Sequence, residues 1–302
     1  MWSKGDLDLK SYLSEKKAMV DRALEAYMPE PDGPASDVIN AMKYSLFAGG
    51  KRLRPILCIS GTEAVGGTEK DCLPVACALE LIHTYSLIHD DLPMMDDDDL
   101  RRGKPTNHKV FGEAVALLAG DALLTEAFKL MTKADLAKHV APQVLLKVIG
   151  LISHASGYQG MVGGQVVDIQ SEGMAVDFSI VKFIHTHKTG ALISASVTSG
   201  AILGRGNESQ LQAIISYGRK IGLAFQISDD ILDIEGDTKA LGKKAGADEK
   251  KGKITYPLVF GLKKSKEIQL ELVEAAVESL RAFDHAAEPL RLIAQYIIER
   301  KK

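Results

Sequence analysis

The sequence CALELIHTYSLIH, residues 77–89, is an apolar stretch that runs directly into the acidic stretch DDLPMMDDDDLRRG, residues 90–103. The apolar stretch has the composition of a buried helix. The acidic stretch places six carboxylates in ten residues and then two arginines. Charges that begin where a buried helix ends cost free energy unless something neutralises them. An acidic loop facing solvent is the simpler interpretation, but a second cluster, DDILD at residues 229–233, lies in equally apolar sequence. The two clusters together predict a shared divalent cation.

Apolar residues follow a helical period over almost the whole chain, and the two-residue alternation of strands is nearly absent. Glycine and proline separate the segments. The expected helices cover residues 7–27, 37–48 with Ser36 as N-cap, 55–65, 71–91, 113–134, 143–157, 177–203 with an interruption at Lys188-Thr189-Gly190, 208–235, and two or three more after a loop at 236–253. No linker divides them. We therefore expect residues 1–302 to form a single all-α domain, with about ten or more helices around a deep central cavity.

Composition and charge narrow the classes of function. The 302 residues are 46% hydrophobic and 25% charged, as in ordinary globular proteins, and the net charge of −3 gives no reason to expect nucleic acid as a partner. Three cysteines in apolar surroundings indicate free thiols in a reducing compartment. No uncharged apolar run reaches the ~18 residues of a membrane span, and the N-terminus lacks a signal core. We expect a soluble, cytoplasmic protein without stable membrane insertion.

The second acidic cluster has the simpler geometry. On a helix, Asp229, Asp230 and Asp233 fall within an arc of roughly 100°. Carboxylates so placed repel one another and need compensation, for which Mg²⁺ is the natural candidate because it prefers hard oxygen ligands. A helix end that faces water is the alternative, but the apolar residues Phe225 and Ile231 are interleaved with the acids.

The first acidic cluster cannot form one regular helical face, because Pro93 interrupts it. We expect Asp90 and Asp91 to end the helix and the following loop to bring Asp96 back to the same ion. The remaining aspartates, 97–99, cannot all be ligands, and at least two of them should face solvent or cap the next turn.

A phosphate-bearing substrate would explain both clusters, because Mg²⁺ held by few carboxylates completes its shell with phosphate oxygens and water. Basic residues at several positions support this interpretation. A lone histidine or a loop lysine is usually structural or solvated, so the combination carries the argument. Lys51 and Arg54 follow a glycine turn at a helix start, and guanidinium groups suit bidentate phosphate contacts. The other candidates are His83 on the face of Asp90, Arg101, Arg102, Lys188 beside Thr189, Lys243 and Lys253.

With these features the chain resembles the trans (head-to-tail) isoprenyl diphosphate synthases, or polyprenyl synthetases. The resemblance covers nearly the whole chain, and two separated aspartate motifs with these partners are highly specific. The matching segments are GGKRLRP at 49–55, IHTYSLIHDD at 82–91, DLRRG at 99–103, GD at 120–121, KTG at 188–190 and QISDDILD at 226–233.

The resemblance implies an all-α homodimer of the isoprenoid synthase fold and Mg²⁺-dependent chain elongation, with several ions and Mn²⁺ as a possible substitute. It implies that Asp90, Asp91, Asp96, Asp229 and Asp233 bind metal and that Asp230 shares in catalysis. It implies a cationic intermediate near the oxygen dipoles of Thr189 and Gln226. It places Arg101, Lys188, Lys243 and Lys253 on the allylic diphosphate, and Lys51, Arg54, His83 and Arg102 on isopentenyl diphosphate.

Product length follows from the residues four and five before the first aspartate, which form the cavity floor in this family. Here they are Ser86 and Tyr85. Tyr85 lies ~7.5 Å along the helix from Asp90, where a ring would block longer chains. With the seven-residue motif from Asp90 to Asp96, this resembles the bacterial-type farnesyl diphosphate synthases. The expected reaction condenses isopentenyl diphosphate with dimethylallyl and geranyl diphosphate to give C15 (E,E)-farnesyl diphosphate.

Alternatives remain at this point. A geranylgeranyl (C20) or geranyl (C10) product is the nearest, and a class I terpene cyclase or a non-catalytic partner subunit is more remote. Cyclases normally have a mixed second metal motif, and such subunits tend to lose one aspartate motif, whereas both motifs are intact here. The basic C-terminus at 300–302 could close over bound isopentenyl diphosphate, but we expect it to fray.

Overall fold

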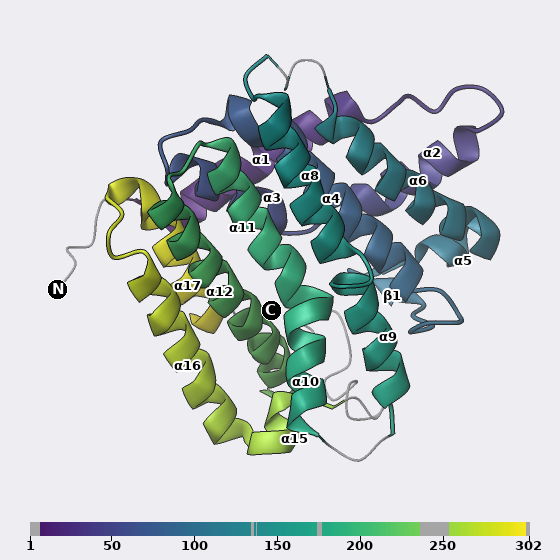
Figure 1. The fold of residues 1–302 in the computed structure, drawn as a ribbon. Helices are drawn as coiled ribbons and strands as arrows, with labels where there is room; N and C mark the ends of the chain where they lie inside the picture. Colours follow the sequence, from purple (N-terminus) through teal and green to yellow (C-terminus); the bar gives the residue numbers. More distant parts are fainter. Residues whose placement is uncertain (1–6, 134–135, 137, 174–176, 236–253, 300–302) are drawn as a thin grey trace.

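The computed structural model describes residues 7–133, 136, 138–173, 177–235 and 254–299. Most of this part of the chain is helical (Figure 1). The first half contains α1 (Leu9–Tyr27), α2 (Ser36–Leu46), α3 (Leu53–Glu63), α4 (Glu69–Asp90), a ribbon of β1 (Leu100–Arg101) and β2 (Lys104–Pro105), α5 (Asn107–Phe111), α6 (Glu113–Met131) and α8 (Pro142–Ser156). The second half contains α9 (Met161–Ser171), α10 (Phe178–Ile184), the π-helix η1 (His185–Gly190), α11 (Ala191–Leu203), α12 (Glu208–Glu235), α15 (Tyr256–Phe260), α16 (Leu262–Ser279), the short 3₁₀ helix η2 (His285–Ala287) and α17 (Glu288–Glu299).

The predicted all-α class is confirmed, and most helices begin and end within a few residues of the expected bounds. Ser36 as an N-cap is wrong, because α2 already includes Ser36 and Ala35 occupies the cap position without a side-chain hydrogen bond. The predicted interruption at 188–190 is a π-helical turn, which continues the axis from α10 into α11 instead of breaking it.

Two helices and a ribbon differ from the sequence-based expectation. The first turn of α9 contains Gly163 and Gly164, and glycine lowers helix propensity, so the sequence pattern favoured an irregular segment. The helix α5 has only five residues, too few to show a helical period. The ribbon β1–β2 has two residues in each strand, too few to show alternation.

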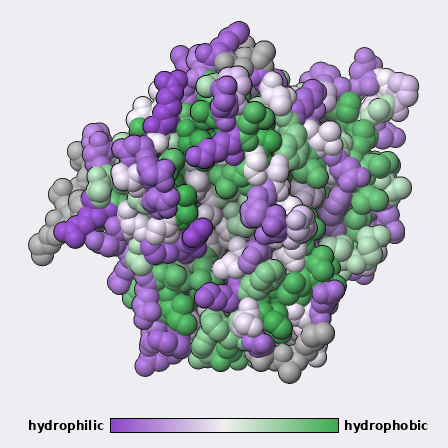
Figure 2. Space-filling model, viewed as in Figure 1, coloured by the Kyte–Doolittle hydropathy of each residue, from purple (hydrophilic) through white to green (hydrophobic). Residues whose placement is uncertain are grey.

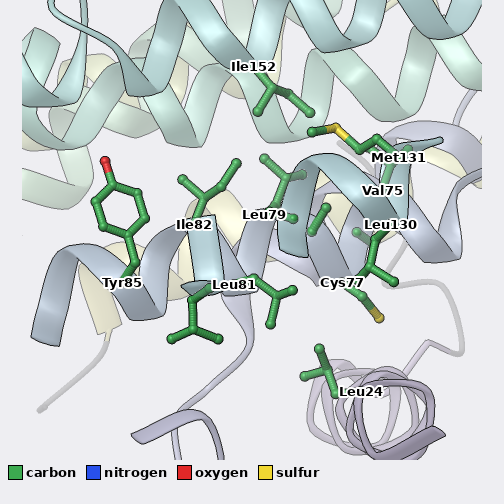
Figure 3. Packing of buried hydrophobic residues seen from close by; sticks show 14 of the residues in the cluster. Leu24, Val75, Cys77, Leu79, Leu81, Ile82, Tyr85, Leu130, Met131 and Ile152 are labelled. Atoms are coloured by element: carbon green, nitrogen blue, oxygen red, sulfur yellow. The ribbon is translucent and has the colours of Figure 1, made fainter. Parts of the chain in front are cut away.

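The helix α4 packs against α3 and α6 and touches α11. Figure 3 shows its buried side chains near Leu24 of α1, Leu130 of α6 and Ile152 of α8. A capping box begins α4: the backbone N–H of Thr68 donates to Asp71 at 2.9 Å. Because neighbours surround α4, its buried side chains Leu79, Leu81 and Ile82 leave it in different directions (Figure 3). By length and composition α4 could span a membrane, but its apolar window is mostly buried inside the protein, as in other core helices.

The helix α12 forms the other structural axis of the fold and packs between α11, α16 and η1 (Figure 1). The fully buried Tyr217 donates its hydroxyl to the carbonyl of Leu290 at 2.6 Å, which ties α12 to α17. Replacing such a buried aromatic residue by alanine typically costs about 3–5 kcal/mol. This anchoring matters for the site, because the last two turns of α12 contain the second acidic cluster.

Candidate active site

A deep cavity of about 730 Å³ lies between α4, α9, η1 and α12. It contains residues of both acidic clusters and several of the predicted basic residues, although these lie far apart in the sequence. The predicted site residues that line it are Arg54, His83, Tyr85, Ser86, Asp90, Asp96, Arg101, Lys188, Thr189, Gln226, Asp229, Asp230 and Asp233. The structure therefore brings most of the predicted residues together around one cavity.

The loop after α4 returns in the predicted way. The backbone N–H of Asp96 donates to the carbonyl of Asp90 at 2.8 Å, and both residues line the cavity. Asp97 takes a left-handed conformation with φ of 50° within this turn. Asp99 lies outside the cavity and pairs with Lys109 at 2.7 Å. The four consecutive aspartates thus have separate environments.

Asp91 is buried and, within the described residues, does not line the cavity. Its carboxylate accepts from Arg101 Nε at 2.7 and 2.8 Å and pairs with Arg101 Nη2 at 2.6 Å. Burial lowers the pKa of Arg101, but the bonds and charge of Asp91 outweigh it and raise that pKa above its usual value. This geometry makes Asp91 the support of a cationic side chain that reaches the cavity.

The second acidic cluster lies on one face of α12, as expected. Asp229 and Asp233 line the cavity. Asp230 is buried, and its carboxylate accepts from the backbone N–H of Tyr256 at 2.9 Å and pairs with His185 Nε2 at 3.0 Å. Gln226 makes a longer contact of 3.4 Å with the same carboxylate. The geometry therefore gives Asp230 a supporting role between helices.

His185 was not predicted from the sequence. Its Nδ1 lies 2.8 Å from the carbonyl of Val181 and its Nε2 faces Asp230, so acceptors face both nitrogens. Burial lowers the pKa of His185, but Asp230 outweighs it and raises that pKa above its ordinary value. A histidine three residues before Lys188 in a helical segment was the available signal.

The predicted Lys188 and Thr189 lie on the π-helical turn, and both side chains line the cavity. Lys188 pairs with Asp168 on α9 at 2.6 Å. Asp168 and Gln165, one turn apart on α9, also line the cavity and were missed, because α9 itself was not predicted. The Oε1 atom of Gln165 is buried and lacks a hydrogen-bond partner among the described residues.

One end of the cavity is basic. Arg54 and His83 line it, and Nε of Arg54 is buried without a hydrogen-bond partner in the described part of the chain. Burial, together with the charges of Arg54 and Arg102, lowers the pKa of His83 well below its usual value, so its imidazole is neutral at neutral pH. Burial also lowers the pKa of Arg54. Donors so arranged suit a phosphate group.

Arg102 lies beside this basic end. It shares a tight turn with Gly103 between β1 and β2, where φ is 54° and 75°. Its guanidinium donates to the carbonyl of Gly49, and a Cβ on Gly50 would lie only 2.7 Å from its Nη1. The glycine pair therefore admits Arg102 against the start of α3. Lys51, which follows the glycine pair, is exposed. Neither Arg102 nor Lys51 lines the cavity in the described structure.

Tyr85 lies on the cavity wall, with 7% of its surface exposed. Its ring meets that of His89 edge-to-face at 5.6 Å between centroids. His89 Nε2 is 2.9 Å from the carbonyl of Leu117, and a Cβ on Gly120 would collide with the imidazole at 2.1 Å. A steric constraint therefore explains the glycine of the GD segment, because Gly120 leaves room for His89, which packs against Tyr85.

The acidic side chains supply a donor set that suits only certain metals. No group of three or more His, Cys, Asp and Glu residues that could chelate a metal occurs within the described residues. Asp90 and Asp96 of the first cluster line the cavity, as do Asp229 and Asp233 of the second, beside Asp230, whose carboxylate is held by Tyr256 and His185. This fits Mg²⁺ that takes its other ligands from phosphate and water. The predicted Lys243 and Lys253 and the basic C-terminus lie outside the described residues.

Comparison with known proteins agrees with this site. The polyprenyl synthetase family profile matches residues 36–291. This chain belongs to the polyprenyl synthetase family and is a prenyltransferase. The family generally uses Mg²⁺.

Individual relatives are similar over nearly the whole chain. The heterodimeric geranylgeranyl pyrophosphate synthase large subunit 1 of Arabidopsis thaliana is 49% identical over 97% of this chain and 80% of its own. The farnesyl diphosphate synthase of Geobacillus stearothermophilus is 47% identical over 97% of this chain and 98% of its own length. The structure of geranylgeranyl pyrophosphate synthetase from Pyrococcus horikoshii aligns with a TM-score of 0.86 and 34% identity, over 97% of this chain and 98% of that chain. This similarity confirms the isoprenoid synthase fold. Relatives named for C15 and C20 products thus have similar identity.

Proposed function

We propose that this protein is a farnesyl diphosphate synthase, which condenses isopentenyl diphosphate with dimethylallyl and then geranyl diphosphate. The observation that carries the proposal is the position of Tyr85, which lines the cavity five residues before Asp90 on α4 and also belongs to the buried apolar core. A phenol ring there, supported by His89 and Gly120, limits the space for a growing chain. The product is C15 when the ring stops elongation after the second condensation.

The cavity residues divide the chemistry. Asp90, Asp96, Asp229 and Asp233 would hold Mg²⁺, which neutralises the charge that develops on the departing diphosphate. Arg101, held by Asp91, and Lys188, held by Asp168, would add positive charge on the same group. Lys243 and Lys253 are proposed for it on sequence grounds alone.

Isopentenyl diphosphate would bind at the basic end, where Arg54, the neutral His83 and Arg102 gather beside Lys51. Departure of the allylic diphosphate leaves an allylic cation, and the isopentenyl double bond attacks it to form the new C–C bond. The resulting cation then loses a proton, which the departed diphosphate would accept as the base. Thr189 and Gln226 supply oxygen dipoles beside the cation, and the apolar wall excludes water that would quench it.

A homodimer in the cytoplasm completes the proposal. Apolar side chains on α6 and α8 support a contact with a second copy: Leu117 is 45%, Leu118 57% and Leu146 68% exposed. Figure 2 shows apolar surface among polar surface on one face of the molecule. Light scattering of the purified protein should give twice the 32.6 kDa chain mass.

The test is product analysis with Mg²⁺, radiolabelled isopentenyl diphosphate and each allylic starter in turn. Wild type should stop at C15, and Tyr85→Ala should extend the product to C20 or longer. Tyr85→Phe, which keeps the ring, is the matched control and should still give C15. A wild type that makes C20 would favour the second candidate, a geranylgeranyl diphosphate synthase, for which several relatives of similar identity are named. No product from any starter would contradict the enzyme function and favour a non-catalytic subunit.

A further inference from the structure

We propose that Arg52 is a positioning residue that neutralises Glu80 and thereby leaves Arg54 and Arg102 available to isopentenyl diphosphate. The inference rests on the proposed function, and it concerns three residues without a sequence-based role: Arg52, Glu80 and Asp21. They join the end of α1, the start of α3 and the middle of α4.

Arg52 is fully engaged inside the protein. It is 3% exposed, and its Nε donates to Asp21 at 2.8 Å, Nη1 to Glu80 at 2.8 Å and Nη2 to the carbonyl of Leu46 at 2.7 Å. Its backbone is left-handed, with φ of 54°, at the N-cap of α3. Residues other than glycine avoid this conformation unless the surrounding structure holds them in it. Arg52 therefore cannot serve as a substrate contact, although it lies between two residues predicted to do so.

Glu80 is a buried anion at the basic end of the site. It is 2% exposed and lies one helical turn before His83 on α4. Its charge acts on Arg54 and Arg102 as well as on Arg52. Within the described residues it forms an ion pair with Arg52 and with neither of the other two arginines. A second acid, Asp21, also pairs with Arg52 and is itself held by Lys17 at 2.5 Å.

The arrangement has an electrostatic consequence. A buried carboxylate without a partner seeks the nearest cation, because an unpaired buried charge is costly. With Arg52 absent, Glu80 would compete with the substrate for Arg54 and Arg102. With Arg52 present, that competition is removed, and Nε of Arg54 stays without a protein partner among the described residues.

Kinetics with both substrates test this role. In R52M the KM for isopentenyl diphosphate should rise about tenfold, as expected for the loss of one charged hydrogen bond to the substrate. The kcat value and the KM for geranyl diphosphate should change less than about twofold, since Asp90 and Asp229 are untouched. In R52M/E80Q the competing charge is gone, and the KM should return to within about threefold of wild type.

Two further variants separate positioning from folding. E80Q keeps Arg52 and raises the local positive charge, so its KM for isopentenyl diphosphate should fall by about twofold. E80Q also serves if R52M does not fold. K17M, which removes an ion pair of the same network at a site distant from the cavity lining, should leave both KM values unchanged.

A purely structural role would lower thermal stability and kcat in R52M while the KM stays constant, and that result would overturn the proposal. A KM in R52M/E80Q as high as in R52M, or a raised KM in E80Q, would overturn it equally. Calorimetric titration of isopentenyl diphosphate into each variant measures binding without turnover. Wild-type binding without any product would refute the proposed function and still allow the Arg52 test.

Discussion

The two acidic clusters line the same cavity, but they are built differently. In the second, a single helix presents Asp229 and Asp233 one turn apart. In the first, a proline-containing loop and a backbone hydrogen bond return Asp96 to Asp90. The second cluster therefore needs only helical periodicity, whereas the first depends on the conformation of an irregular loop.

Each cluster also contains one buried aspartate that holds a basic residue. Asp91 holds Arg101, and Asp230 holds His185. Arginine cannot lose its proton in a protein, whereas histidine can. The comparison teaches that each acidic motif contains one supporting carboxylate. The basic residue it holds is permanently charged in the first cluster, Arg101, and titratable in the second, His185.

The largest expected effect comes from the carboxylates that line the cavity. D90N and D229N should each lower kcat by about 10³-fold, because they remove oxygen ligands proposed for the metal ions that stabilise the leaving group. Steady-state assays at saturating Mg²⁺ measure this, with circular dichroism to establish that the variants fold. Loss of activity in only one of the two variants would contradict a metal-binding role for both clusters.

The buried aspartates should affect stability, and unequally. D91N leaves the charge of Arg101 with only the longer contact to Asp98 at 3.8 Å and should lower the free energy of unfolding by about 3 kcal/mol. D230N should cost about 1–2 kcal/mol, because His185 can become neutral and keep a hydrogen bond. Urea denaturation at pH 7 compares the two. Equal losses of unfolding free energy in the two variants would show that deprotonation of His185 does not reduce the cost of D230N.

The His185–Asp230 pair should make stability depend on pH. The folded-state pKa of His185 is raised, so its stabilising contribution is fully present below its unfolded pKa of 6.5 and is lost as the pH rises through the folded pKa. Melting temperatures of wild type should therefore fall more steeply above pH 6.5 than those of H185Q. Parallel curves for the two proteins would contradict a charged His185.

The smallest effect is expected at Asp99. This aspartate is exposed and pairs only with Lys109 in the described structure, and surface ion pairs contribute little. D99N should leave kcat, both KM values and the melting temperature unchanged within error, in contrast to D90N. A strong loss of activity would mean that the acidic run acts as a whole, and it would remove the division of roles proposed for the first cluster.

The site could be predicted where chemistry is local in sequence. Asp229 and Asp233 were predicted from helical spacing and Lys188-Thr189 from a motif, and all four residues line the cavity. His185 and Asp168 could not be identified in this way, because their partners Asp230 and Lys188 lie 45 and 20 residues away. Gln165 was missed because glycine obscured the helix α9. The loop brings Asp96 back beside Asp90 on the cavity wall, and the backbone hydrogen bond that holds it there could not be predicted from the sequence.

By itself, the sequence determined the helical class, the central apolar helix, and the family, because periodicity and motif spacing are properties of neighbouring residues. Only the tertiary structure decided which charges meet. Arg52 and Arg54 are two residues apart and look equivalent in the sequence, yet one is buried in a network with Asp21 and Glu80 and the other lines the cavity. The reason is physical: the environment of a charge depends on burial and on distant partners, and both arise only when the helices pack.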